Sequence, residues 1–90
     1  MDAAADAEAE AAYDWYATVN PQAARRFRER LREAIVSISE DAEGQPRYEG
    51  EVRRYLLPKY PYGVLYEVID DTVFVVAVMH LKRRPLYWKK

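Results

Sequence analysis

The residues best suited to chemistry lie at the end of the chain. Residues 80–90 contain one histidine, five basic residues and two aromatic residues. Lysine and arginine attract phosphates or an acidic protein surface, and a neighbouring ring can stack on a nucleobase or enter a partner's pocket. Two consecutive arginines on a predicted strand extend this cationic set. The predicted macromolecule-binding residues are Arg53, Arg54, Lys82, Arg83, Arg84, Tyr87 and Trp88. The alternative is a solvated tail whose aromatic residues cover the sheet edge.

His80 is the candidate general acid or base, because it is the only histidine and histidine titrates near neutral pH. At the end of a strand, however, a histidine is more often a structural hydrogen-bonding residue. The sequence contains no Ser-His-Asp spacing, paired-carboxylate motif or glycine-rich phosphate loop. With no cysteine and one histidine, it has too few ligands for a Cys/His metal centre. We therefore expect no metal and no cofactor.

Tyr13, Trp15 and Tyr16 form a second group of interest. They fall within four residues of an otherwise alanine-rich segment. Three rings so close together on one helix cannot all face one core, so we expect at least one to be exposed or to contact a partner. Core packing is the expected role of the other two.

Hydrophobic periodicity predicts two helices that precede the strands. Larger side chains recur every three or four residues over residues 3–19 and again over residues 21–38. Asn20-Pro21 should end the first helix and cap the second. The predicted buried stripes are Ala5, Ala9, Ala12, Tyr16 and Val19 on the first helix, and Ala24, Phe27, Leu31, Ile35 and Ile38 on the second.

After residue 50 the apolar period changes from helical to alternating. Residues 39–50 hold two glycines, a proline and four acids and predict a connecting loop. Strands are predicted at residues 52–57, 64–69 and 72–79, with a tight turn at Asp70-Asp71. The third strand is apolar on both faces, which favours a central or well-covered position. Short connections favour antiparallel neighbours, so we expect an α+β domain in which a helical hairpin packs on a three-stranded antiparallel sheet.

Length, charge and hydropathy limit the class of protein further. Ninety residues make one small domain, residues 1–90. The longest apolar run, residues 73–79, is too short to cross a bilayer, and the acidic start does not resemble a signal peptide, so we expect a cytoplasmic protein without membrane association. Residues 1–50 carry eleven acids and six arginines (net −5), and residues 51–90 carry four acids and eight bases (net +4). The overall charge of −1 argues against a dedicated nucleic-acid-binding domain.

The order of motifs resembles the RelE/ParE superfamily of type II toxins, over nearly the whole chain. The matching pieces are Asp14-Trp15-Tyr16, Asn20-Pro21, residues 24–27, residues 52–56, residues 60–66, and residues 77–83 with Pro85, Tyr87 and Trp88. The resemblance implies a helical hairpin on an antiparallel sheet and a cytoplasmic bacterial growth inhibitor of the plasmid-stabilisation type. It also implies neutralisation by a cognate ParD- or RelB-like antitoxin. Apolar grooves beside such a hairpin accept an amphipathic helix, so we expect Tyr13 and Trp15 to contact the antitoxin.

Departures from the superfamily pattern bear on the target. The usual strand before the first helix is not predicted, so either this edge strand is absent or the start of the chain was assigned late. Gly63, Leu56 and Leu81 stand where the ribosome-dependent nucleases of the RelE branch carry basic residues. Arg54 and Tyr87 match that pattern, and a shift in register would let Lys82 or Arg83 take the place of Leu81. The chain therefore resembles the ParE-like branch, which poisons DNA gyrase by binding. The alternative is an endoribonuclease that cuts messenger RNA on the ribosome, with His80 or Tyr87 assisting proton transfer and Arg54 and Arg83 steadying the phosphate. An inactive, antitoxin-binding relic is the third reading.

Overall fold

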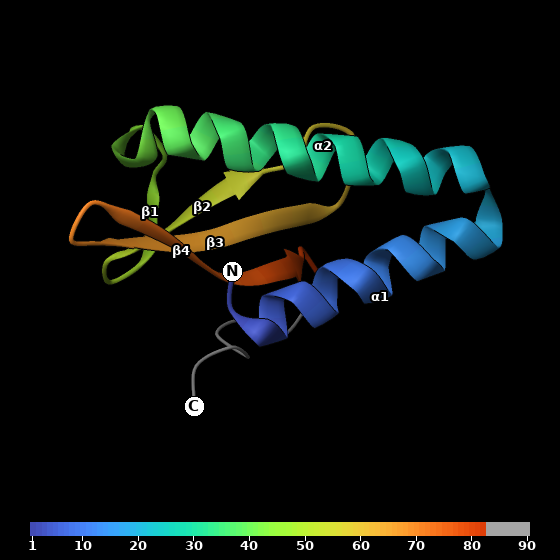
Figure 1. The fold of residues 1–90 in the computed structure, drawn as a ribbon, viewed down its shortest axis with the longest axis horizontal. Helices are drawn as coiled ribbons and strands as arrows, with labels where there is room; N and C mark the ends of the chain where they lie inside the picture. The colour runs from blue at the N-terminus through green and yellow to red at the C-terminus, as the bar shows by residue number, and fades with distance from the viewer. Residues whose placement is uncertain (83–90) are drawn as a thin grey trace.

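Two antiparallel helices lie on one face of an antiparallel sheet in the computed structural model of the chain, which describes residues 1–82 (Figure 1). Helix α1 is Ala3–Val19 and helix α2 is Pro21–Glu40. The Asn20 side chain accepts a hydrogen bond from the Gln22 backbone N–H at 2.9 Å, and Pro21 fills the first position of α2. These contacts satisfy a backbone donor that a helix start leaves unpaired. The predicted helix boundary is confirmed.

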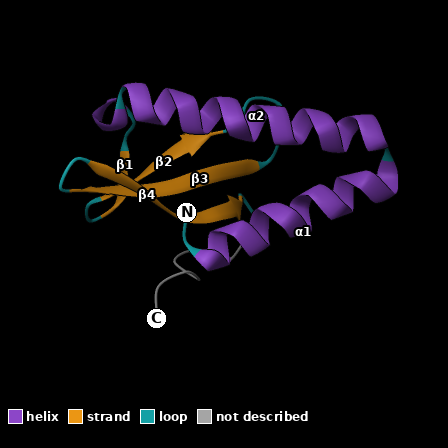
Figure 2. Ribbon diagram, in the orientation of Figure 1, coloured by secondary structure: helices purple, strands orange, loops and turns teal. Residues whose placement is uncertain are grey.

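The sheet of the described region has four strands in the order β1-β2-β3-β4, all antiparallel (Figure 2). Their bounds are β1 Arg47–Glu49, β2 Val52–Leu56, β3 Tyr62–Ile69 and β4 Thr72–His80. The three predicted strands are confirmed. The predicted loop over residues 39–50 is wrong, because this segment also holds a 3-10 turn at Ala42–Gly44 and strand β1. A three-residue strand is too short to show alternation, and only pairing with β2 defines it.

Strand β4 lies at an edge of the sheet, so of the two positions that its composition predicts, central or well covered, it does not have the central one. Both of its faces are packed: Val75 and Val78 belong to the core beneath the helices, and Ala77 and Met79 belong to a cluster on the opposite face. Two contacts from the start of the chain also occupy its outer edge: the Asp2 backbone N–H donates to the Val75 carbonyl at 2.9 Å, and the Val78 N–H donates to Glu8 Oε1 at 3.2 Å. Within residues 1–82 no strand precedes α1, as expected. These contacts shield part of an edge that would otherwise invite strand addition.

The turn between β3 and β4 is the predicted Asp70-Asp71 pair. Both residues have positive φ, at 50° and 64°. Two successive left-handed residues match the twist of a tight antiparallel hairpin, and aspartate tolerates this conformation better than most residues.

The main core lies between the helices and the sheet. The α2 stripe is confirmed, with Ile35 partly buried against the core. On α1, Ala5 and Ala12 are buried, but Val19 is 67% exposed, so its predicted burial is wrong. Val19 lies at the bend of the hairpin, which extends beyond the end of the sheet (Figure 1). A second, smaller cluster of Val52, Leu65, Ala77 and Met79 lies on the opposite face of the sheet. No helix within residues 1–82 is long and apolar enough to cross a membrane.

Candidate functional site

Three of the predicted macromolecule-binding residues lie in the described part of the chain: Arg53, Arg54 and Lys82. The other four, Arg83, Arg84, Tyr87 and Trp88, lie outside the described residues. Lys82 is exposed and lies two residues after the end of β4. The structure therefore shows on which face of the sheet the two arginines of β2 and His80 of β4 lie.

Arg53 points to the helix-covered face of the sheet. It pairs in register with Tyr66, whose side chain belongs to the main core. Arg53 Nη1 donates to the carbonyl oxygens of Glu43 at 3.1 Å and Gln45 at 2.6 Å. The Tyr66 hydroxyl donates to the Ala42 carbonyl in the same turn. Arg53 and Tyr66 together anchor the 3-10 turn to the sheet.

The Tyr66 phenol remains a neutral donor in this anchor. Burial raises the pKa of Tyr66, the Arg53 guanidinium opposes the rise in part, and Asp41 adds to it. A phenol that stays protonated keeps its hydrogen bond to the Ala42 carbonyl throughout the physiological pH range.

We expect Arg53→Met to lower the free energy of unfolding by about 1–2 kcal/mol, because it removes two charge-assisted hydrogen bonds to backbone carbonyls. Arg54→Met is the matched control, since the Arg54 side chain makes no hydrogen bond within residues 1–82. Urea denaturation of both variants measures the difference. Equal losses for the two variants would contradict the anchoring role of Arg53.

Arg54 points to the face of the sheet away from the helices. It pairs in register with Leu65, and its guanidinium lies over the Tyr48 ring at 4.9 Å from the ring centroid. A Cβ atom at position 63 would lie 3.2 Å from Arg54 Cγ and Cδ, so Gly63 makes room for the arginine stem. Because successive side chains on a strand alternate, the structure does not bring Arg53 and Arg54 into one surface.

His80 faces the helices, opposite to Arg54. It pairs with Tyr62 across β3, and the two rings meet edge-on at 5.0 Å. Met79, the residue before His80, belongs to the cluster on the far face of the sheet. Leu65, which pairs with Arg54, belongs to the same cluster. His80 Nδ1 accepts the Lys82 backbone N–H at 3.0 Å, which places the proton of the neutral ring on Nε2. The structure therefore separates His80 from Arg54 by the thickness of the sheet.

A groove runs between α1 and the end of the β3–β4 pair. Two pockets of about 270 and 400 Å³ share Trp15, Tyr62 and His80, and we call them together the Trp15 groove. Trp15 is 61% exposed, which confirms that one ring of the α1 group faces outward. The full lining is Glu8, Ala11, Ala12, Trp15, Tyr16, Pro61, Tyr62, Val78 and His80.

The two tyrosines of the Trp15 groove remain protonated at physiological pH. Burial raises the pKa of Tyr62 and is also the largest cause of the raised pKa of Tyr16, to which Tyr62 and Tyr60 add. A neutral phenol offers a hydroxyl that both donates and accepts, and it does not act as a base. These two phenols therefore serve recognition rather than proton transfer, and Glu8 and His80 line the groove beside them.

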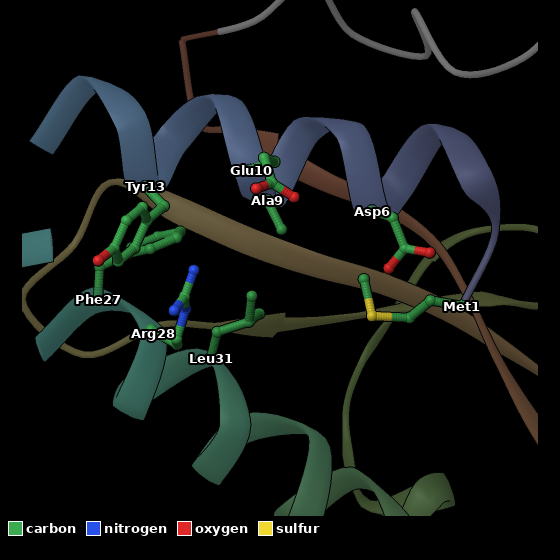
Figure 3. Close-up of a pocket in the computed structure, with 8 residues that line it drawn as sticks. All are labelled: Met1, Asp6, Ala9, Glu10, Tyr13, Phe27, Arg28 and Leu31. Atoms are coloured by element: carbon green, nitrogen blue, oxygen red, sulfur yellow. The ribbon is translucent and has the colours of Figure 1, made fainter. Parts of the chain in front are cut away.

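Tyr13 lines a different pocket, on the other side of α1. This pocket of about 270 Å³ lies between the two helices and has an apolar floor with Asp6, Glu10 and Arg28 at its rim (Figure 3). The Arg28 guanidinium covers the Tyr13 ring at 3.9 Å from the centroid. Residues two apart on a helix point about 200° away from each other, so Tyr13 and Trp15 do not share one groove.

Sequence reasoning missed one further cluster. Arg26, Arg30, Lys59 and Tyr60 line a pocket of about 380 Å³ beside the first half of α2. The four-residue spacing of Arg26 and Arg30 was visible in the sequence, but the approach of Lys59 was not. Among residues 1–82, no group of His, Cys, Asp or Glu side chains is arranged to hold a metal ion.

Comparison with known proteins agrees with this architecture. A family model described as the ParE toxin of the type II toxin-antitoxin system, parDE, matches residues 1–85. No curated protein matches the chain. The matched range includes both helices and all four strands of the described region. On this evidence of sequence, supported by a helical hairpin packed on an antiparallel sheet, the chain belongs to the ParE toxin family of type II toxin-antitoxin systems.

Proposed function

We propose that this toxin inhibits growth by binding DNA gyrase and that it performs no reaction of its own. Its partner is a cognate antitoxin, and residues 1–90 act as a single domain in the cytoplasm. The choice of gyrase rests on membership of the ParE family, whose resemblance implies that target. The choice of binding over cleavage rests on the geometry of the sheet.

The separation of His80 from Arg54 is the observation that carries the proposal. An RNA-cleaving site needs a proton-transfer group and a cation within reach of the same phosphate. Of the proposed nuclease residues, these two are described, and they point to opposite faces of the sheet. Leu56 and Leu81, which stand where the nucleases carry basic residues, are exposed and uncharged. This separation of His80 from Arg54 supports binding rather than cleavage.

The proposed target-binding surface consists of Arg54 and Lys82 together with Arg83, Arg84, Tyr87 and Trp88 from outside the described residues. We leave Arg53 out of this surface because its guanidinium anchors the 3-10 turn. Cations beside aromatic residues suit an acidic surface on a partner protein, where the rings enter pockets and the charges guide association.

The proposed antitoxin contact is the Trp15 groove. Trp15 offers a large exposed ring beside two adjoining pockets, whereas the Tyr13 ring is already covered by Arg28. Helix α1 carries four acids and no base, so the complementary antitoxin segment is apolar on one side and basic on the other. Tyr13 and the pocket between the helices provide a secondary contact.

The experiment is expression of the chain without antitoxin in a bacterial host. We expect filamentation and gyrase-dependent DNA breaks before any loss of messenger RNA. The His80→Gln variant should remain toxic within about twofold, because His80 takes no part in the proposed target surface. Arg83→Ala combined with Tyr87→Ala should abolish toxicity while antitoxin binding persists, which shows that the double variant still folds.

Three outcomes would contradict the proposal. Messenger RNA cut on ribosomes before DNA damage would identify a nuclease. Absence of toxicity from the unaltered chain would identify a relic. A folded Arg83→Ala, Tyr87→Ala variant that remains fully toxic would remove the target surface from these residues.

A further inference from the structure

Three basic side chains from two distant parts of the chain converge on one pocket. Arg26 and Arg30 come from α2, and Lys59 comes from the connection between β2 and β3. Tyr60 completes the lining of this pocket, whose volume is about 380 Å³. We call it the Arg26 pocket. No acidic residue from the described part of the chain lines it.

The cations gather here against their mutual repulsion. Arg26 and Arg30 are one helical turn apart, a spacing at which like charges destabilise a helix. Lys59 adopts a φ of 66°, a left-handed conformation that is unfavourable for a residue with a Cβ atom. Each feature alone is common on protein surfaces. Together they place three positive charges in one concavity, which an anion would stabilise.

A carboxylate on α2 is paired with one of these cations. Arg30 Nη1 forms an ion pair with Glu33 at 3.2 Å, and the Glu33 side chain is 64% exposed. An exposed pair of this kind is weak. A guanidinium also has five N–H donors, so the pair leaves Arg30 able to bind a second anion.

The wall of the pocket is preorganised by the aromatic core. The Tyr60 hydroxyl donates to the Ala23 carbonyl at 3.1 Å, and the Tyr60 ring packs edge-on against Tyr16 at 5.2 Å and Phe27 at 5.5 Å. These contacts fix the backbone next to Lys59 against the first half of α2. Binding an anion therefore requires the ordering of side chains only, which keeps its entropic cost low.

We propose that the Arg26 pocket binds the phosphate group of a phosphorylated ligand. Two arginines and a lysine can satisfy several phosphate oxygens at once, with the guanidinium forks engaged in pairs of hydrogen bonds. The volume lies within the range of small-molecule sites and exceeds that of a single phosphate, so part of the attached molecule also fits. The pocket shares no residue with the proposed target surface or the Trp15 groove, and the inference goes beyond the proposed function.

Two sources of phosphate meet this chemistry: the backbone of DNA and a free nucleotide. The experiment titrates the purified, isotope-labelled chain with inorganic phosphate, ATP and a short DNA duplex, and follows the amide signals of Arg26, Arg30 and Lys59. We expect saturable shifts with phosphate. The variants Arg30→Gln and Lys59→Gly should each weaken binding at least fivefold. Glycine at position 59 suits the left-handed backbone, so this variant removes the charge without straining the turn.

Arg25→Gln and Arg32→Gln are the matched controls, because both arginines are exposed on α2 and do not line the pocket. They should change phosphate affinity by less than twofold. With DNA as ligand, loss of one pocket cation should reduce the slope of log affinity against log salt by about one. Tighter binding of DNA than of ATP assigns the pocket to the DNA backbone, and the reverse assigns it to a nucleotide; both support the proposal.

The proposal fails if no saturation is reached at about 10 mM phosphate, because the dissociation constant would then lie above the millimolar range. It also fails if the control variants weaken binding as much as the pocket variants, since the attraction would then come from the overall charge of α2. Both measurements use the isolated chain, so they stand apart from toxicity and gyrase binding.

Discussion

Phe27→Ala should lower the free energy of unfolding by about 3–5 kcal/mol, the usual cost of removing a buried phenylalanine side chain. Phe27 is 1% exposed and lies at the centre of the aromatic core. Its ring stacks on Tyr16 at 5.4 Å and meets Tyr60 and Tyr62 edge-on at 5.5 and 5.3 Å. A cavity at this point removes contacts from α1, α2 and β3 together. Small domains have little stability to spare, so the variant should be close to unfolding at physiological temperature.

The chain provides a matched control in its one other phenylalanine. Phe74 is 46% exposed and lies on β4 opposite Glu67. We expect Phe74→Ala to cost less than about 1 kcal/mol. Urea denaturation followed by circular dichroism compares the two variants. A loss for Phe74→Ala as large as that for Phe27→Ala would show that the main core does not dominate stability.

Trp15→Ala should weaken antitoxin binding by about 30-fold or more, because exposed tryptophans that enter a partner's interface contribute about 2 kcal/mol or more. The stability of the free toxin should change by less than about 1 kcal/mol, since most of the ring is in solvent. Its only ring contact within residues 1–82 is with Tyr16, edge-on at 5.1 Å. Titration calorimetry with the purified antitoxin measures the loss.

Tyr13→Ala is the control for the side of α1 that the antitoxin occupies. We expect it to weaken antitoxin binding by less than about fivefold, because Arg28 already covers the Tyr13 ring. If Tyr13→Ala weakens binding more than Trp15→Ala does, the main contact is the pocket between the helices. If neither variant affects binding, the antitoxin docks on neither side of α1.

In the proposed function, the separation of the two faces of the sheet lets one small domain bind an antitoxin and a target. The Trp15 groove lies on the helix side, and Arg54 lies on the far side. In the proposed arrangement, an antitoxin segment in the groove and a target at Arg54 do not compete for the same side chains. The antitoxin would then neutralise the toxin either through its steric bulk or through further contacts outside the groove. The Trp15→Ala variant helps to distinguish these two cases.

The helices, the three main strands and the hairpin turn were determined by the sequence itself. These elements depend on contacts between residues three or four apart on a helix, on alternation along a strand, and on local caps. Asn20-Pro21 and Asp70-Asp71 act within a few residues, so their outcomes could be predicted without knowledge of the fold. The exposure of one of the three rings of Tyr13, Trp15 and Tyr16 could be predicted in the same way, because the directions of neighbouring side chains on a helix depend only on local geometry.

The tertiary structure decided which face each side chain serves. Alternation shows that Arg53 and Arg54 point apart, but only the packing of the helices shows that Arg53 is the anchor and that Arg54 lies on the face without helices. Strand β1 forms because β2 offers an edge for pairing. The Arg26 pocket forms because the fold brings Lys59 to α2 across about thirty residues of chain. Such contacts depend on how whole elements pack, and no local pattern records them.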